Sequence, residues 1–203
     1  MDKQEALRSL DEKAGVLFSV SDSIWDNPET DYTENVSSSI LKEALEKEGF
    51  TVESNLAGIP TAFSGTFGSG SPVIGILGEF DALPGLSQKA GIAEKEPLEK
   101  GGNGHGCGHN LLGAGSLAAA IAVKEYLKEK KCPGTVVYFG CPAEEGGSAK
   151  AFLARDGVFS HVDIALSWHP NNMNAVWAFS SLANVKVRYS FKGISAHAGT
   201  SPH

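Results

Sequence analysis

The N-terminal part of the chain shows side chains at helical spacing. Small and apolar residues recur every three or four positions, at Leu7, Leu10, Ala14, Leu17, Ser21 and Ile24. This period predicts one amphipathic helix, and Asn27-Pro28 marks its end. The pattern returns between Val36 and Leu45 and is followed by Gly49, a residue type that commonly ends helices. The sequence therefore predicts two helices here.

The spacing then changes to that of strands. Residues 50–54 predict a short strand. The side chains of residues 61–67 alternate in character, which also predicts a strand, and residues 73–78 form an apolar run typical of a buried strand. Because the turn residues 68–72 separate the last two, we expect them to pair as a hairpin. Residues 86–104 are irregular and carry mixed charge, which indicates a surface excursion.

Strands and helices alternate in the rest of the chain. Helices are predicted at 111–128 and 148–156, and apolar strands at 134–141 and 162–167. This order is typical of an α/β domain. Its mostly parallel sheet is buried between helices on both faces.

Residues 182–191 have a different character from the strands before them. They alternate cleanly, which predicts a half-exposed strand. We therefore expect the α/β domain to cover residues 1–181 and a second domain to occupy residues 182–203. A domain of roughly 20 residues cannot bury a core, so we expect this chain to be a fragment of a longer one.

Composition and charge exclude several classes of function. A formal net charge of −7 argues against nucleic acid or an anionic membrane as partner. No apolar run approaches the roughly 18 residues that span a bilayer, and residues 1–5 lack the features of a signal peptide. Three cysteines among 203 residues make no disulfide framework. We expect a cytoplasmic protein, in which Cys107 is a free thiol or a metal-bound thiolate.

The stretch 104–110, Gly-His-Gly-Cys-Gly-His-Asn, alternates glycines with side chains that bind metals. Glycine allows close approach of the backbone to another group, while cysteine and histidine suit zinc and its neighbours. Because a predicted helix follows, Cys107 and His109 should lie in a tight loop at its N-terminus. The motif predicts half of a metal site, although a glycine-rich turn with a buried thiol stays an alternative.

Polar side chains follow four consecutive core elements of the predicted domain. They are Asp81, the Cys107 and His109 loop, the Glu144-Glu145 pair, and His169. Ligands bind outside the carboxyl ends of the strands in open α/β sheets, and all four groups fall there. Each also has an ordinary explanation: a turn cap, a turn with a buried thiol, a solvated loop, or a core histidine. Their coincidence favours a metal site.

The adjacent glutamates suggest divided labour. One can bind a metal, while its neighbour, pointing elsewhere, transfers protons. A metal lowers the pKa of its bound water toward about 7, and a nearby carboxylate can take that proton and give it to a leaving group. Zincin, Cys-x-x-Cys, phosphate-loop and Gly-x-Ser-x-Gly motifs are absent from the sequence. A Cys107 nucleophile activated by His105 or His109 remains an alternative, but it leaves the glutamates without a role.

Five motifs occur together along the chain. They are Phe80-Asp81-Ala82-Leu83-Pro84, His105-Gly106-Cys107-Gly108-His109-Asn110, Pro142-Ala143-Glu144-Glu145-Gly146-Gly147, Trp168-His169-Pro170 and Gly193-Ile194-Ser195-Ala196-His197-Ala198-Gly199. In this order and spacing they resemble the amidohydrolase branch of the aminoacylase/glutamate-carboxypeptidase metallopeptidase family. The resemblance covers nearly the whole chain and is more specific for the family than for a substrate.

The resemblance implies a zinc-exopeptidase-like α/β domain with an α+β lid, or dimerisation, domain inserted into it. It implies two divalent ions, zinc or manganese, held by Cys107, His109, Glu145 and His169. Glu144 matches the catalytic general base, Asp81 the acidic residue that supports the site, and His197 a lid histidine that steadies the oxyanion in the partner's site. The last metal ligand and the groups that bind the substrate carboxylate are expected beyond residue 203. Asn110 replaces the aspartate more usual in this branch.

The implied activity is hydrolysis of the amide bond of an N-acyl amino acid, with p-aminobenzoyl-glutamate as first candidate. A dipeptidase or a general acyl-amino-acid deacylase is the alternative within the family. A metal-binding or dimerisation module without catalysis is the alternative of another class. We expect a homodimer or heteromer formed through the lid, and we expect the 203-residue chain alone to be inactive and to bind metal weakly.

Overall fold

The structure is a computed structural model that describes residues 2–178, 180, 182–185, 187–194, 196–197 and 199–200. The chain divides into two units between Asn171 and Asn172. The described residues of the second unit, including those within 182–191, form no helix or strand. The predicted second domain and its boundary therefore stay a prediction. No helix among the described residues is long and apolar enough to cross a bilayer.

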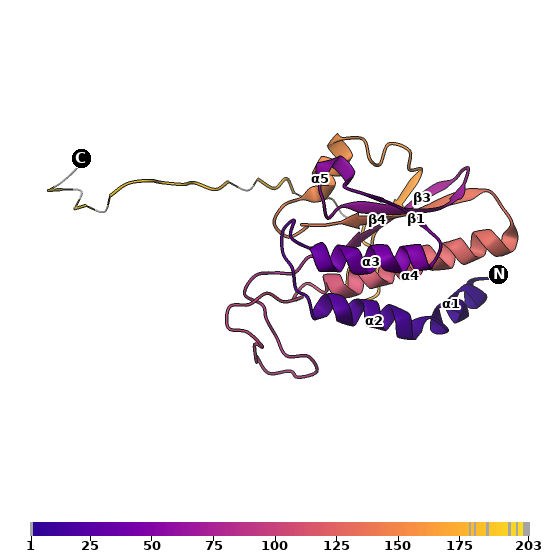
Figure 1. Ribbon diagram of the computed structural model, residues 1–203, viewed down its shortest axis with the longest axis horizontal. Helices are drawn as coiled ribbons and strands as arrows, with labels where there is room; N and C mark the ends of the chain where they lie inside the picture. The colour runs from indigo at the N-terminus through magenta and orange to yellow at the C-terminus, as the bar shows by residue number, and fades with distance from the viewer. Residues whose placement is uncertain are drawn as a thin grey trace. The chain divides into compact units, whose positions relative to one another are not determined.

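One sheet organises the first unit (Figure 1). Its described strands are β1 (Thr51–Ser54), β2 (Phe63–Ser69), β3 (Val73–Glu79), β4 (Gly134–Cys141) and β5 (Ile164–Leu166), in the spatial order β1-β2-β4-β3-β5. β3 pairs in parallel with both β4 and β5, whereas β1 with β2 and β2 with β4 are antiparallel. The α/β class is confirmed, and the sheet is mixed.

The predicted hairpin of β2 and β3 is wrong because β4 lies between them. Val136 of β4 pairs with Phe67 of β2 on one side and with Ile74 of β3 on the other. The turn between β2 and β3 spans the start of β4, since the Thr135 N–H donates to the Pro72 carbonyl at 2.9 Å. A turn sequence cannot reveal that a distant strand inserts beneath it.

The described helices are α1 (Lys3–Asp11), α2 (Ala14–Trp25), α3 (Asn35–Lys47), α4 (His109–Lys130) and α5 (Ala149–Arg155), with a short 3-10 turn, η1 (Leu56–Gly58). The single helix predicted over Leu7–Ile24 is wrong, because the helical conformation is interrupted at Glu12 and Lys13, between α1 and α2. Lys13 Nζ lies 2.6 Å from Glu48 Oε1 just past the end of α3. The break keeps the apolar spacing, so periodicity alone does not reveal it.

Helices cover both faces of the sheet, as predicted (Figure 1). On one face α2, α3 and α4 bury the larger core, which includes Ile24, Leu41, Leu117 and Tyr138. On the other face Leu153 of α5 and Leu56 of η1 pack with alternate residues of β4. Burial of these apolar side chains removes them from water and supplies the main stabilisation of the unit.

A buried lysine ties the helical layer together, and its removal gives a stability prediction. Lys124 of α4 places Nζ 2.7 Å from Glu48 Oε2 and 2.9 Å from the Glu48 carbonyl. We expect Lys124→Met to lower the free energy of unfolding by about 1–3 kcal/mol, because Glu48 and Glu125 both lose the buried ammonium group. Among the described residues Glu48 then keeps only Lys13. Lys128→Met removes an exposed contact with Glu125 and should cost under about 0.5 kcal/mol. Equal urea midpoints for the two variants would contradict this prediction.

Candidate metal centre

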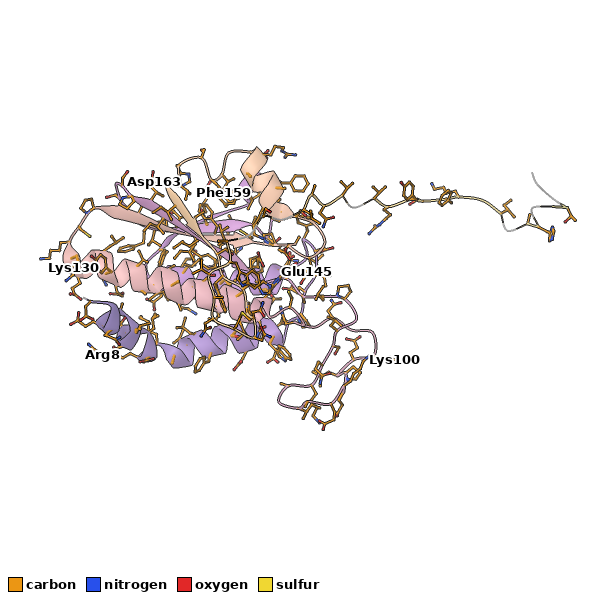
Figure 2. The ribbon with its side chains drawn as sticks, turned by 180° about the vertical axis from the view of Figure 1, so that it is seen from behind. Arg8, Lys100, Lys130, Glu145, Phe159 and Asp163 are labelled. Carbon is orange, nitrogen blue, oxygen red and sulfur yellow. The ribbon has the colours of Figure 1, made fainter. Side chains whose placement is uncertain are left out.

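The site forms where parallel strands end. β3, β4 and β5 run in the same direction, so the residues that follow them emerge at one edge of the sheet. The loop before α4 reaches the same edge. Figure 2 shows Glu145 near the first turns of α4, while Lys130 marks the helix's far end. Segments far apart in sequence thus supply side chains to one place.

His109 is the buried centre of this arrangement. α4 begins at this residue, two positions before the predicted start, and the side chain is fully buried. Its Nδ1 lies 2.9 Å from Asp81 Oδ1. Because a carboxylate only accepts, the hydrogen bond assigns a proton to Nδ1, so in the neutral ring the lone pair is on Nε2. That lone pair is the usual metal-binding form of histidine.

The second ring nitrogen of His109 faces a carboxylate without a hydrogen bond. Nε2 lies 3.1 Å from Glu79 Oε2, yet Nε2 has no hydrogen-bond partner among the described residues. Burial lowers the pKa of His109, but Asp81, Glu79 and Glu145 outweigh it, and the pKa is raised. Two lone pairs this close require a positive charge between them or beside them, either a proton or a metal ion.

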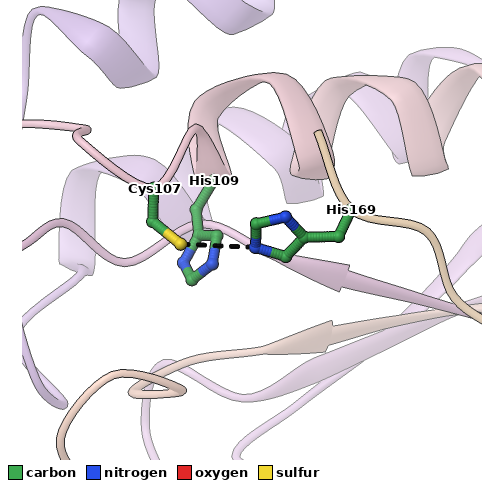
Figure 3. Close-up of side chains that lie close together, drawn as sticks. All are labelled: Cys107, His109 and His169. Atoms are coloured by element: carbon green, nitrogen blue, oxygen red, sulfur yellow. Dashed lines mark hydrogen bonds between the residues drawn. The ribbon is translucent and has the colours of Figure 1, made fainter. Parts of the chain in front are cut away.

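Cys107 and His169 complete a three-residue group with His109 (Figure 3). Cys107 Sγ lies 3.3 Å from His169 Nε2, and one ligand atom from each of the three residues lies within 4.8 Å of the others. Trp168, the residue before His169, packs against Gly115 of α4, where a Cβ would come within 2.6 Å of the indole. This packing helps to place His169. The small residue lets the chain after β5 pack closely on α4.

The surroundings of Cys107 oppose the nucleophile alternative. Burial, followed by Glu145, Glu144 and Glu79, raises the pKa of the thiol to about 12. A catalytic thiol needs a lowered pKa, whereas a bound metal cation would make the thiolate favourable. The histidine that Cys107 contacts is His169, whereas His105 places Nε2 3.0 Å from the Ile24 carbonyl.

The two glutamates after β4 differ in environment. The Glu145 N–H donates to Asp81 Oδ2 at 2.9 Å, and its Oε1 is buried without a partner among the described residues. Glu144 is exposed, with a carboxylate oxygen within 4.8 Å of ligand atoms of Glu79 and His109. Partial burial and the charge of Glu79 raise the pKa of Glu144, which moves it toward the range useful for proton transfer.

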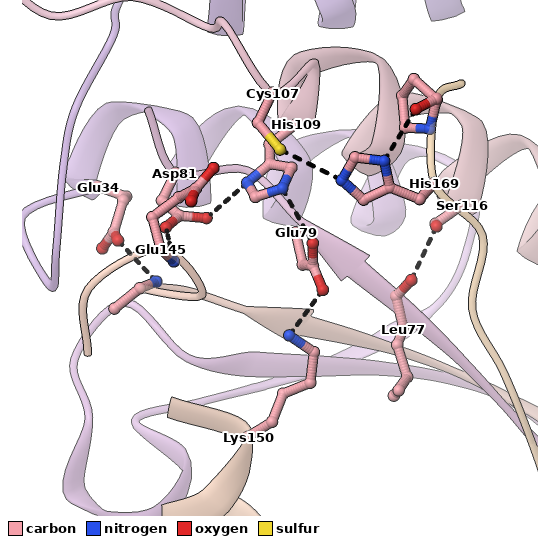
Figure 4. A network of polar contacts seen from close by, with 12 residues as sticks. Glu34, Leu77, Glu79, Asp81, Cys107, His109, Ser116, Glu145, Lys150 and His169 are labelled. Carbon is pink, nitrogen blue, oxygen red and sulfur yellow. Dashed lines mark hydrogen bonds and ion pairs between the residues drawn. The ribbon is translucent and has the colours of Figure 1, made fainter. Parts of the chain in front are cut away.

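Sequence reasoning missed Glu79 and Lys150. Glu79 ends β3 and is 7% exposed, and its Oε1 lies 2.7 Å from Lys150 Nζ of α5 (Figure 4). A signal for Glu79 did exist, because side chains two apart in an extended chain point the same way. Glu79 and Asp81 accordingly face the two ring nitrogens of His109. Lys150 carries no comparable signal in the sequence.

The residues at this edge fit a divalent cation. Thiol, imidazole and carboxylate are the groups that bind zinc and its neighbours, and all three are present. Four carboxylates (Glu79, Asp81, Glu144 and Glu145) gather near one lysine, and two buried atoms, His109 Nε2 and Glu145 Oε1, lack partners among the described residues. His197 belongs to the second unit, where its Nδ1 accepts the Gly199 N–H at 3.2 Å. Its role stays a prediction.

Comparisons with known proteins show the family to which the chain belongs. The profile of Peptidase family M20/M25/M40 matches residues 75–196. The chain is 53% identical to a component of the p-aminobenzoyl-glutamate hydrolase of Escherichia coli, covering 91% of this chain and 38% of that protein. It is 30% identical to the human Xaa-Arg dipeptidase, covering 98% of this chain and 45% of that protein. The chain therefore spans less than half the length of these relatives.

A solved structure shares the fold. The M20-family peptidase YXEP of Bacillus subtilis, described as dinuclear and metal-binding, superposes with a TM-score of 0.65 at 21% identity. The match covers 84% of this chain and 44% of that one. At this identity the likeness supports the fold, and the chemistry rests on the residues described above.

Proposed function

Because the chain belongs to peptidase family M20/M25/M40, we propose that the whole protein is a metal-dependent amidohydrolase that cleaves the amide bond of N-acyl amino acids. One observation carries the proposal. Ligand atoms of Cys107, His109 and His169 lie within 4.8 Å of one another, and His109 Nε2 is buried without a hydrogen bond among the described residues. This is an arrangement that a cation would complete.

We assign Cys107, His109, Glu145 and His169 to two divalent ions, zinc or manganese. Bound there, such ions would polarise a substrate carbonyl and lower the pKa of a water molecule. Glu144 accepts the proton of that water and passes it to the leaving amine. Its neighbour Glu145 has a buried carboxylate oxygen without a hydrogen-bond partner among the described residues, which supports the division between proton transfer and metal binding.

Asp81 orients the ligands rather than meeting the substrate. One carboxylate oxygen accepts from His109 Nδ1 and the other from the Glu145 N–H. This double contact fixes the histidine tautomer and the glutamate backbone at once. We propose that His197, on a lid within residues 182–203, donates a hydrogen bond to the oxyanion, a contact worth about 3 kcal/mol.

The first candidate substrate is p-aminobenzoyl-glutamate, supported by the name of the Escherichia coli relative. A dipeptide is the second candidate, supported by the name of the human relative. We propose that the protein acts as a homodimer or heteromer through its lid. A cytoplasmic location is also a proposal, supported by the free state of Cys107, Cys132 and Cys141.

Metal removal tests the proposal in the whole protein. We expect dialysis against a chelator to abolish hydrolysis, and zinc or manganese to restore it. Metal at 100 times its Kd should also stabilise the folded state by about 2.7 kcal/mol, which a thermal unfolding curve measures. The substrate panel contains p-aminobenzoyl-glutamate, an N-acetyl amino acid and a dipeptide ending in arginine. Undiminished hydrolysis by metal-free protein would refute the proposal.

A further inference from the structure

A short N-terminal segment, residues 31–34, holds the turn that presents the two glutamates. That turn covers residues 143–147 and follows β4. Residues 31–34 precede α3 and lie more than 100 positions earlier in the chain. The two segments meet through hydrogen bonds and close packing, and Figure 4 shows the hydrogen bond between Glu34 and the turn. No motif in the sequence links them.

Glu34 makes the most direct of these contacts. Its side chain is fully buried, and its Oε1 accepts the Ala143 N–H at 2.9 Å and the Tyr32 N–H at 3.1 Å. Its Oε2 accepts from the Thr61 hydroxyl at 3.1 Å. A carboxylate removed from water is costly unless hydrogen bonds satisfy it. Such a group is unusual in a core, so its position calls for a reason.

The residue that Glu34 holds has a strained backbone. Ala143 has φ of +52°, a left-handed conformation that costs a residue with a Cβ of order 1 kcal/mol or more. Its carbonyl accepts from the N–H groups of Gly147 and Ser148, at 2.9 and 2.7 Å. The hydrogen bond from Ala143 to Glu34 helps to hold this conformation. The direction in which the chain enters Glu144 and Glu145 depends on it.

Two more residues of the segment close on the far end of the turn. The Tyr32 hydroxyl donates to the Gly147 carbonyl at 2.6 Å. A Cβ at Gly147 would collide with the Tyr32 ring, and one at Gly146 would collide with the Asp31 carboxylate. Residues 31–34 thus hold both ends of the turn. Asp81 holds its middle, because it accepts a hydrogen bond from the Glu145 N–H.

We propose that Glu34 is a positioning residue of the amidohydrolase site, which sets the orientation of Glu144 and Glu145 through its hydrogen bond to Ala143. The inference rests on the proposed function for the roles of the two glutamates. It assigns a purpose to a buried carboxylate that touches neither metal ligand nor substrate. Residues that orient metal ligands typically change metal affinity 10- to 100-fold when replaced, and we expect that range here.

The test compares Glu34→Ala with Glu34→Gln and Thr61→Val in the whole protein. Glu34→Ala leaves the Ala143 N–H without its acceptor, so metal affinity should fall about 10- to 100-fold, with kcat lowered and KM little changed. Glu34→Gln keeps an oxygen for Ala143 and should restore most of both. Thr61→Val removes a hydrogen bond from the same carboxylate but leaves Ala143 held, so it should lower stability alone.

Zinc affinity is measured by chelator competition, and folding by circular dichroism. Wild-type zinc affinity in folded Glu34→Ala would overturn the proposal, as would an equal loss of affinity in Thr61→Val. If Glu34→Ala does not fold, Glu34→Asp is measured in its place. This variant keeps a buried carboxylate, but the shorter side chain moves the carboxylate away from the Ala143 N–H. Wild-type zinc affinity in Glu34→Asp would then overturn the proposal. If the wild-type protein hydrolyses no substrate of the panel, the proposed function fails. The zinc affinities of the variants would still test whether Glu34 positions the metal ligands.

Discussion

Glu144→Gln in the whole protein is expected to lower kcat for amide hydrolysis by about 10²- to 10⁴-fold, the usual contribution of a general acid–base. Glutamine has nearly the same size and keeps a hydrogen-bonding end, but its amide does not accept a proton at neutral pH. Glu144 is exposed, so the fold should tolerate the change. Metal content should stay at the wild-type level, which elemental analysis measures together with steady-state rates.

Glu145→Gln is the matched control for Glu144→Gln. The two residues are neighbours on one turn, but Glu145 has a buried Oε1 and binds Asp81 through its N–H. We expect Glu145→Gln to lose metal as well as activity, because the variant removes a charged ligand. A Glu144→Gln protein with near wild-type turnover would remove Glu144 from the mechanism. Exchanged behaviour of the two variants would reverse their roles.

Asp81→Asn is expected to weaken metal binding by about 10- to 100-fold. Each carboxylate oxygen of Asp81 accepts one donor, His109 Nδ1 and the Glu145 N–H. Asparagine offers one oxygen and an NH₂ group, so one of the two donors must face another donor. Either His109 loses its tautomer control or the Glu145 backbone loses its anchor. Chelator competition with zinc measures the loss.

Asp163→Asn provides the control at the other end of β3. Asp163 Oδ2 also accepts a backbone N–H, from Val73 at 2.7 Å, but no residue of the candidate site is its partner. Its replacement should leave zinc affinity unchanged and alter stability only slightly. Equal zinc affinities in the Asp81 and Asp163 variants would show that Asp81 does not orient the ligands.

Sequence patterns were informative wherever the cause of structure is local. The end of α3 is an example: Gly49 has φ of +81°, and the Phe50 N–H donates to the Leu45 carbonyl, a helix ending that favours glycine. β4 has the predicted bounds because its continuous apolar run is long enough to identify a buried strand. The helix predicted from residue 111 starts at His109, within the usual uncertainty of helix ends.

The misses share a different cause, which is contact between distant segments. Nothing near β2 and β3 shows that β4 inserts between them, since pairing depends on a strand more than 60 residues later. Lys150 meets Glu79, and Glu34 meets Ala143, across comparable separations. A single charged residue has no periodicity, so neither its burial nor its partner can be inferred from the sequence.

The sequence by itself determined the α/β class and the chemistry available to the site, because spacing identifies elements and side-chain type identifies possible ligands. Tertiary structure alone decided the strand order. It also decided which atoms of the site face one another, as His109 does between Asp81 and Glu79. The physical reason is that hydrogen bonds and ion pairs act over a few ångströms. They depend on where chain segments meet, and local sequence patterns do not encode those distances.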